Sequence, residues 1–330
     1  MQGRLYKALP TIYDGGVAPS TDENEGYPMD AFSETRSLPT FDQRLGACPL
    51  CDSARIRAYD VDYTGRTIDR CSNCGVMFMN PQYSDDYLDD YYRNYIGIGA
   101  HDDEASAPGN ASRCLIHQHY MSLIEERCGR GKLLCVGCGD GLEISVASQR
   151  GWEAEGFDVD PNVTAALSER LNVKVSSGDF CGTAYPADHF DCVYLHQVLE
   201  HPKSPQDHLR KIHAILKPTG VLFIACPNVR SVSSRLKTLA GKLGLKKRRG
   251  KHYDTWHHVF YYSPGVLKHI LQRHYGFRVI RIENGFGDKA RNFPAHRIRR
   301  EIRWNRFLPC WKDVFVLIAT RDQVPDATSP

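Results

Sequence analysis

Four cysteines in two closely spaced pairs carry the clearest chemistry in this chain. Cys48 and Cys51 form one C-x2-C pair, and Cys71 and Cys74 form a second pair after 19 intervening residues. Two such pairs place four thiolates at the corners of a tetrahedron, where Zn²⁺ accepts sulfur ligands at about 2.3 Å. Disulfides, the main alternative, are disfavoured in a chain without an export signal. We therefore expect a structural zinc ribbon that leaves no open ligand position for catalysis.

Alternating glycines mark a second site. Residues 133–136 have the length of a buried parallel strand, and Gly137, Gly139 and Gly141 follow them. Glycine lets the backbone bend where a Cβ would clash, so amides in this turn can face a polar ligand. Asp158 follows the first glycine by roughly 20 residues, a distance at which an acid takes the hydroxyls of a ribose. The G-x-G-x-G spacing differs from the dinucleotide fingerprint and disfavours a nicotinamide dehydrogenase.

A longer pattern downstream is more specific. Residues 190–228 read FDCVYLHQVLEHPKSPQDHLRKIHAILKPTGVLFIACPN: a strand, an LEH helix start, a helix ending in LKPTG, and a strand closing on Pro-Asn. This stretch resembles the core of the class I S-adenosylmethionine-dependent methyltransferases, and the resemblance covers about residues 114–321. It implies an α/β fold, a Rossmann-like seven-stranded sheet with an antiparallel last strand, preceded here by the small zinc-ribbon module.

The resemblance also implies a site for S-adenosylmethionine. The residues that it assigns to the cofactor are Gly137, Cys138, Gly139, Gly141, Asp158, Asp179, Phe180 and Leu195. The glycine loop would lie under the methionine part, and Asp158 would bind the ribose hydroxyls. Asp179 would accept from the adenine amino group, with Phe180 beside the ring. The backbone around Leu195 would close the pocket near the sulfonium.

One position departs from the pattern of that family. The resembling enzymes usually carry an acid two residues before the first glycine, where this chain has Cys135. A contact with the ammonium group of the cofactor is therefore lost or made through another group. This departure keeps a non-catalytic zinc-ribbon binding protein open as an alternative function.

The candidate catalytic residues are histidines and one glutamate, most of them just after the strand expected over residues 190–196. A hydroxyl acceptor benefits from a base of near-neutral pKa, which points to histidine. The residues selected by motif are His196, Glu200, His201 and His258. His196 follows the strand and is expected to face the methyl group, whereas Glu200 and His201 begin the next helix.

The same segment is similar to the metal-assisted O-methyltransferases of quinone biosynthesis and of small-RNA end modification. Those enzymes carry Glu-x-x-Glu-His after this strand, and the RNA enzymes add a later His. Here Gln197 replaces the first Glu, and an amide is a poorer ligand for Mg²⁺ than a carboxylate. The replacement disfavours a catalytic Mg²⁺, and a purely structural role of Glu200 and His201 in fixing the helix is at least as well supported.

Positive charge is concentrated in one part of the chain. Residues 229–306 contain 20 Lys and Arg against four Asp and Glu, a local charge of +16, so the rest carries −13 although the net charge is +3. Inside a basic insert, residues 229–257, Val232, Leu236, Leu239 and Leu243 recur at helical spacing. A basic amphipathic helix of this kind lies on an anionic membrane, binds a phosphate, or packs its leucines on the domain.

The remaining pattern predicts the organisation of the chain. The expected parts are an irregular or disordered extension (1–46), the zinc ribbon (47–80), a tyrosine-rich linker with a helix (81–112), the methyltransferase domain (113–323) and a tail (324–330). The expected strands lie near residues 132–137, 153–158, 173–176, 190–196, 221–226, 277–284 and 313–321. A helix is expected between Ser263, as N-cap, and Gly276.

Composition and the combination of the zinc ribbon with the methyltransferase-like domain limit the possible functions. Hydrophobic residues make up 42% and charged residues 25%, as in globular proteins, and neither a membrane span nor a signal peptide is evident, so we expect a cytoplasmic protein. The whole resembles bacterial enzymes of surface-polysaccharide and sugar-modifying pathways. We expect methylation of a hydroxyl or carbon of a small anionic acceptor, such as a sugar diphosphate or lipid-linked glycan. An RNA methyltransferase is the alternative, disfavoured because the ribbon lacks a basic-aromatic stacking surface.

Overall fold

The computed structural model describes residues 39–62, 64–93, 108–245, 250–253, 255, 257–305 and 307–322. The tail expected over residues 324–330 lies outside these ranges. So do most of the extension expected over residues 1–46 and residues 246–249 of the basic insert.

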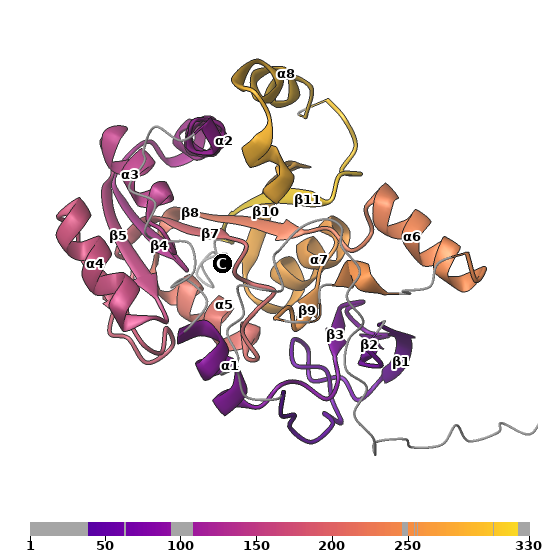
Figure 1. Ribbon diagram of the computed structural model, residues 1–330. Helices are drawn as coiled ribbons and strands as arrows, with labels where there is room; N and C mark the ends of the chain where they lie inside the picture. Colours follow the sequence, from indigo (N-terminus) through magenta and orange to yellow (C-terminus); the bar gives the residue numbers. More distant parts are fainter. Residues whose placement is uncertain are drawn as a thin grey trace, which may run out of the picture. The chain divides into compact units, whose positions relative to one another are not determined.

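A seven-stranded sheet with the order β10-β11-β8-β7-β4-β5-β6 organises most of the described chain (Figure 1). Its strands are β4 (Lys132–Val136), β5 (Glu153–Asp158), β6 (Val175–Ser177), β7 (Phe190–His196), β8 (Leu216–Pro227), β10 (Phe277–Asn284) and β11 (Val314–Arg321). The strands from β6 to β8 pair in parallel, whereas β11 runs antiparallel between β8 and β10. The α/β fold with an antiparallel last strand, expected from the sequence, is confirmed.

Apolar runs explain why the central strands are buried on both faces. Helices cover both faces of a parallel sheet, so its strands read as continuous rather than alternating apolar segments. The segment VLFIAC of β8 fits this rule, because each of its side chains is fully buried. The strand begins five residues before the expected position, since Leu216 is also buried and pairs with Phe190 across a register shift.

Two sets of helices pack against the two faces of the sheet (Figure 1). On one face lie α2 (Pro108–Cys128), α3 (Leu142–Gln149), α4 (Pro161–Leu171) and α8 (Ala295–Asn305), which share a core cluster with β4, β7 and β8. On the other face lie α5 (Pro205–Ile215) and α7 (Pro264–His274). Because β4, β5 and β7 run parallel to one another, the turns that follow them lie at the same edge of the sheet.

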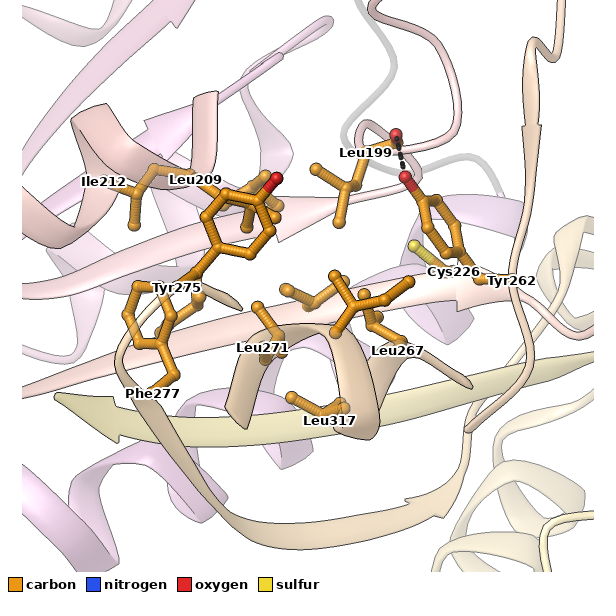
Figure 2. Close-up of a cluster of buried hydrophobic side chains, with 14 of the residues drawn as sticks. Leu199, Leu209, Ile212, Cys226, Tyr262, Leu267, Leu271, Tyr275, Phe277 and Leu317 are labelled. Carbon is orange, nitrogen blue, oxygen red and sulfur yellow. Dashed lines mark hydrogen bonds between the residues drawn. The ribbon is translucent and has the colours of Figure 1, made fainter. Parts of the chain in front are cut away.

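The core under α7 shows how this second layer is held (Figure 2). Leu267 and Leu271 of α7 are fully buried and belong to the same cluster as Leu317 of β11. Tyr262, just before the helix, donates its hydroxyl to the carbonyl of Leu199 at 3.3 Å. This bond ties the chain before α7 to the segment that follows β7.

The two ends of α7 agree only partly with the sequence prediction. Ser263 occupies the N-cap position, but its hydroxyl makes no capping hydrogen bond. Gly276 adopts a φ of 65°, the left-handed conformation with which helices commonly end.

The cysteine-rich segment forms a second, four-stranded sheet. Strands β1 (Ile56–Val61), β2 (Thr67–Cys71) and β3 (Met77–Met79) pair in antiparallel order, and β9 (Phe260–Tyr261) completes the sheet by pairing with β3. The segment between the two cysteine pairs therefore forms a hairpin of β1 and β2. The contribution of β9 was not predicted, because a two-residue strand leaves no periodic signal in the sequence.

Shorter helices border this second sheet. They are α1 (Asp85–Arg93), α6 (Val232–Lys242) and the 3-10 helix η3 (Lys251–Tyr253). The 3-10 helix η4 (Asp288–Asn292) instead packs against α2, and its Ala290 belongs to the core cluster of the large sheet. The helix expected in the tyrosine-rich linker is α1, whose Tyr87 and Tyr91 are buried one helical turn apart. Among the described residues, no helix is both long enough and apolar enough to span a bilayer.

Candidate functional site

The glycine turn after β4 adopts the backbone that the sequence predicted. Gly137, Gly139 and Gly141 have φ values of 67°, 47° and 76°, a region that side chains with a Cβ rarely enter. A Cβ on Gly137 would lie 2.6 Å from Val198, so the segment after β7 packs directly on this turn. A Cβ on Gly139 would meet no atom within 4 Å. The middle of the turn therefore faces open space, where a ligand can approach the backbone.

Asp158 closes the same turn from the end of β5. Its Oδ2 accepts from the backbone N–H of Gly139 at 2.9 Å, and its Oδ1 accepts from Asp160 at 3.3 Å. The side chain is 6% exposed, and burial raises the pKa of Asp158. An ionised carboxylate has about four acceptor positions, so it retains acceptor capacity for hydroxyl groups of a ligand.

Asp179 and Phe180, which the resemblance also assigns to the cofactor, make contacts within the protein. Both carboxylate oxygens of Asp179 accept from its own turn, from Cys181 N at 3.0 Å and Gly182 N at 2.9 Å. Phe180 is 2% exposed and packs edge-on against Phe157. These contacts within the protein hold the turn whether or not a ligand is bound. The contacts of Asp179 and Phe180 with adenine therefore stay predictions.

Cys138 and Leu195 are also buried. Cys138 is 1% exposed, and burial raises the pKa of its thiol, which makes it a packing residue rather than a nucleophile. Leu195 is fully buried in β7 and pairs with Val136 of β4. Its role stays a prediction that concerns its backbone.

His196 is the last residue of β7 and lies in a buried cluster that the sequence did not predict. Its Nδ1 lies 3.4 Å from Oε1 of Glu143, in the first turn of α3, and Nε2 of His117, on α2, lies 3.4 Å from the same oxygen. Nδ1 of His117 lies 2.9 Å from the hydroxyl of Tyr194. Val136 pairs with Leu195 near the ends of β4 and β7. Gly137 and His196 each follow one of these residues directly, so this cluster lies beside the glycine turn.

The electrostatics of the cluster keep its carboxylate ionised. Burial favours the neutral acid of Glu143, but the facing imidazoles of His117 and His196 outweigh it and lower its pKa to about 2. Burial lowers the pKa of His117 to about 4, so this imidazole is neutral at pH 7. A buried charge that keeps its ionised form needs polar partners, and here one ring nitrogen of each histidine lies 3.4 Å from Oε1 of Glu143.

A second histidine cluster follows five residues later in the chain. His201, His257 and His258 place one ring nitrogen each within 4.8 Å of one another. The rings of His201 and His257 stack at 5.1 Å, and Nδ1 of His201 lies 2.9 Å from the hydroxyl of Tyr92, on α1. The structure thus brings His201 and His258 together and adds His257, and the catalytic roles of His201 and His258 stay predictions.

Glu200 lies beside this cluster but faces β8. It is 1% exposed, and its Oε2 accepts from Sγ of Cys226 at 3.5 Å. Its carbonyl accepts from the amides of Val259 and Phe260 at 2.9 and 3.0 Å, which ties the start of β9 to the segment after β7. The prediction that Glu200 and His201 begin the next helix is wrong, because α5 begins at Pro205. The contacts of Glu200 hold β8 and β9 rather than that helix, and its catalytic role stays a prediction.

Burial keeps the imidazoles of the second cluster neutral. Burial lowers the pKa of His201 to about 3 and that of His257 to about 4, and it lowers the pKa of His258 well below the usual value. The group of mutually close ligand atoms contains no carboxylate among the residues that the structure describes. Three imidazole nitrogens suit a transition metal or mutual packing better than Mg²⁺, which prefers oxygen ligands.

The four cysteines predicted to bind zinc come together. Their sulfurs lie within 4.8 Å of one another, with 3.6 Å between Cys48 and Cys74 and 3.6 Å between Cys51 and Cys71. A tetrahedral site with Zn–S bonds of about 2.3 Å has sulfurs about 3.8 Å apart. The donor set and its spacing fit this metal.

The basic insert forms α6, whose apolar stripe is exposed. Leu236, Leu239 and Leu243 are 61%, 54% and 63% exposed, which contradicts the alternative that the leucines pack on the domain. Figure 1 shows α6 projecting beside the small sheet.

A cavity of about 320 Å³ lies between α6 and that small sheet. The residues that line it include Arg230, Arg235, Lys242, Tyr59 and Tyr253. Tyr253 packs edge-on against Tyr261 at 5.1 Å, and the Tyr261 hydroxyl donates to the carbonyl of His258 at 2.8 Å. The cavity thus borders the segment that carries the second histidine cluster.

Sequence reasoning missed His117, Glu143 and His257. His117 and Glu143 lie on helices that carry no motif, and only folding brings them to the end of β7. His257 is adjacent to the predicted His258, so the doubled histidine was a signal that could have identified it.

Comparisons with known proteins agree with this geometry. Residues 113–282, just over half of the chain, match the family described as "Methyltransferase domain". A ubiquinone biosynthesis O-methyltransferase of Coxiella burnetii is 30% identical over 134 residues, which cover 38% of this chain and 57% of that protein. The mitochondrial ubiquinone biosynthesis O-methyltransferase of Homo sapiens is 30% identical over 152 residues, covering 43% of this chain and 40% of that protein. The chain thus spans about half the length of the curated relatives that it matches.

Solved structures with a similar fold are more distant in sequence. A 1,6-didemethyltoxoflavin-N1-methyltransferase of Burkholderia thailandensis is 15% identical, with a TM-score of 0.48, and the match covers 81% of this chain and 100% of that chain.

Proposed function

The chain belongs to the methyltransferase-domain family, and we propose that it transfers a methyl group from S-adenosylmethionine to a hydroxyl or carbon of a small anionic acceptor. The observation that carries this proposal is the meeting of three elements at one edge of the sheet. They are the open glycine turn after β4, the carboxylate of Asp158 after β5 and the imidazole of His196 at the end of β7. Together they offer a ligand site beside a base.

The residues at this edge fit the proposed cofactor. When bound, S-adenosylmethionine supplies an electrophilic methyl group on a sulfonium. Gly139 leaves its backbone accessible to the ligand, and Asp158 offers a charged acceptor for ribose hydroxyls. Since methyl transfer is largely a positioning problem, these residues act by binding and orienting rather than by covalent chemistry.

The cavity beside α6 supports an acceptor that carries phosphate. Arg230, Arg235 and Lys242 provide positive charge, and Tyr59 and Tyr253 provide rigid walls with polar tips. Guanidinium groups match the geometry of phosphate oxygens and bind them in pairs. A sugar attached to a diphosphate, free or lipid-linked, fits this combination.

The exposed stripe of α6 supports contact with an anionic membrane, which would deliver a lipid-linked acceptor. Leucines on one side and Arg235, Lys237 and Lys242 elsewhere on the helix are typical of interfacial helices. We expect the protein to co-sediment with phosphatidylglycerol vesicles and not with phosphatidylcholine vesicles. Joint replacement of the three leucines by serine is expected to abolish this binding, whereas Val61→Ser, an exposed apolar residue on β1, preserves it. Equal binding by both variants would remove the membrane from the proposal.

We further propose that the four cysteines hold one structural Zn²⁺, kept available as thiolates by the reducing cytoplasm expected from the sequence. The small sheet holds the start of the segment that carries the second histidine cluster, since Met79 N donates to the carbonyl of Val259 at 2.8 Å. Elemental analysis is expected to find about one zinc per chain, lost in Cys71→Ser and retained in the matched control Cys310→Ser. Protein that contains no metal when prepared without chelator would contradict this part.

The experiment that tests the function is an acceptor screen with S-adenosylmethionine labelled in its methyl group. Nucleotide-diphosphate sugars and lipid pyrophosphate glycans are expected to gain label. Arg235→Ala combined with Lys242→Ala is expected to raise the acceptor KM and leave cofactor affinity unchanged, because the cavity binds only the acceptor. Label found only in RNA would replace the proposal with the RNA methyltransferase alternative. Absence of label from every acceptor, despite cofactor binding, would contradict it.

A further inference from the structure

The cluster formed by His117, Glu143 and His196 has an arrangement that settles where its protons lie. Tyr194 is fully buried, and burial raises its pKa well above the usual value, so its hydroxyl stays protonated. Nε2 of His117 faces Oε1 of Glu143 at 3.4 Å, and an ionised carboxylate can only accept, so Nε2 carries the proton. A neutral imidazole has one donor and one acceptor nitrogen, so Nδ1 is the acceptor and the Tyr194 hydroxyl, at 2.9 Å, donates to it.

The same reasoning orients His196. Its Nδ1 is the ring nitrogen that faces Oε1 of Glu143, at 3.4 Å. The carboxylate stays ionised and can only accept, so Nδ1 of His196 carries the proton. The second ring nitrogen, Nε2, is then left with its lone pair. The side chain of His196 is 23% exposed, whereas those of Glu143 and His117 are 10% and 3% exposed.

We propose that Glu143 is a positioning residue that holds His196 with its proton on Nδ1, so that Nε2 serves as the general base for a hydroxyl acceptor. This inference rests on the proposed function. As the acceptor oxygen bonds to the methyl carbon, the hydroxyl proton passes to Nε2. The carbon–sulfur bond of the donor breaks, and its electron pair stays on sulfur. The negative charge of Glu143 stabilises the imidazolium that forms.

His117 has a distinct part in this arrangement. It gives the buried carboxylate a second N–H donor without adding a charge, because burial keeps His117 neutral above its pKa of about 4. A buried carboxylate that lost this donor would favour its neutral form and would weaken its hold on His196. Among the residues that the structure describes, the titratable or charged groups around the cluster are Glu143, His117, Tyr120, Tyr194, Cys135, Cys138, Arg113 and Asp140.

The first test reads the tautomer directly and needs no acceptor. In the full chain with ¹⁵N-labelled histidine, NMR is expected to show His196 protonated at Nδ1 and unprotonated at Nε2, with signals assigned by their loss in His196→Gln. In Glu143→Gln, His196 is expected to become a mixture of tautomers, since an amide no longer requires a proton donor at Nδ1. A wild-type His196 protonated at Nε2 would overturn the proposal even if the variant failed to fold.

A matched control lies on the same helix. His119 and Glu283 form another buried imidazole–carboxylate pair, with Nε2 and Oε1 3.1 Å apart, and Glu283 is 3% exposed. Glu283→Gln removes a comparable contact without touching His196. It is expected to leave the tautomer of His196 unchanged, which separates a local effect from general loosening of α2.

Kinetics supply the second test. Glu143→Gln is expected to lower kcat by about 10²-fold or more, within the range of general-base contributions, and to move the acidic limb of the kcat/KM profile to lower pH. Cofactor affinity is expected to stay within about twofold, and Glu143→Asp to restore part of the rate. An unchanged pH profile in a variant that still binds cofactor would overturn the proposal. So would a second metal ion per chain that disappears in Glu143→Gln, because the three residues would then be metal ligands. If the wild-type protein methylates nothing, the proposed function fails, but the NMR result still decides the arrangement.

Discussion

His196 and His201 stand five residues apart in the chain and belong to clusters with opposite electrostatic properties. His196 and His117 face the ionised carboxylate of Glu143, which can orient an imidazole and stabilise its cation. His201 lies close to two other imidazoles, those of His257 and His258. This group contains no carboxylate among the residues that the structure describes. The residue type is the same in both places, but only the first of the two clusters contains a carboxylate among the residues that the structure describes.

The difference teaches that a histidine motif does not identify a base by itself. The sequence presented His196, His201 and His258 as equal candidates. Burial without a counter-charge lowers the pKa of His201 to about 3, which makes it a very weak base at pH 7. The cluster beside the glycine turn combines burial with an anion, and it is where we place proton transfer.

The largest expected effect is on turnover. His196→Gln is expected to lower kcat by about 10²- to 10⁴-fold, the usual contribution of a general base, and His201→Gln by less than about tenfold, since His201 is not a base in this account. Both rates are measured at saturating acceptor and cofactor. A larger loss in His201→Gln than in His196→Gln would reverse the comparison.

An intermediate effect is expected on stability in acid. The folded-state pKa values of His201 and His257, about 3 and about 4, lie below the unfolded value of about 6.5. The unfolded chain therefore binds more protons, and the free energy of unfolding falls as the pH falls from about 6.5 through 4. Buried His117 adds to this loss, whereas Glu143, with a pKa of about 2, stays ionised throughout.

Denaturant titrations at pH 7 and pH 4.5 measure this effect. The wild-type protein is expected to lose at least about 2 kcal/mol between them, since one pKa unit corresponds to about 1.4 kcal/mol. The variant His201→Gln/His257→Gln is expected to lose clearly less, because glutamine does not titrate. Equal losses in the two proteins would show that the second cluster is already charged at neutral pH.

The smallest expected effect concerns magnesium. Three imidazole nitrogens are poor ligands for Mg²⁺, and Glu200 hydrogen-bonds with Cys226. Adding millimolar Mg²⁺ to protein freed of loosely bound metal is expected to change turnover by less than about twofold. A tenfold activation that disappears in Glu200→Gln would instead make the second cluster the catalytic centre.

Local signals in the sequence predicted much of the fold and part of the site. The spacing of Cys48, Cys51, Cys71 and Cys74 predicted their meeting, because ligand pairs in tight turns are set locally. The strand pattern and the glycine turn were predictable for the same reason. Contacts made only by packing of distant segments were not, as with Glu143 and His117 or the pairing of β9 with β3.

The exposure of α6 illustrates the other limit of sequence patterns. The leucine spacing predicted a helix with an apolar stripe, but it fitted a packed stripe and an exposed one equally well. Only the structure distinguished them, since Leu236, Leu239 and Leu243 are exposed.

Calorimetric titration with S-adenosylmethionine tests the central claim most directly, because every later step requires that cofactor at the glycine turn. We expect one binding site per chain and at least tenfold weaker binding in Asp158→Ala. Each hydrogen bond to a charged group is worth about 1.5–3 kcal/mol, and the ribose hydroxyls would lose theirs. The control Asp188→Ala removes an exposed carboxylate that pairs with Arg321 and is expected to bind as the wild type does. No binding by the wild-type protein, or undiminished affinity in Asp158→Ala, would contradict the account.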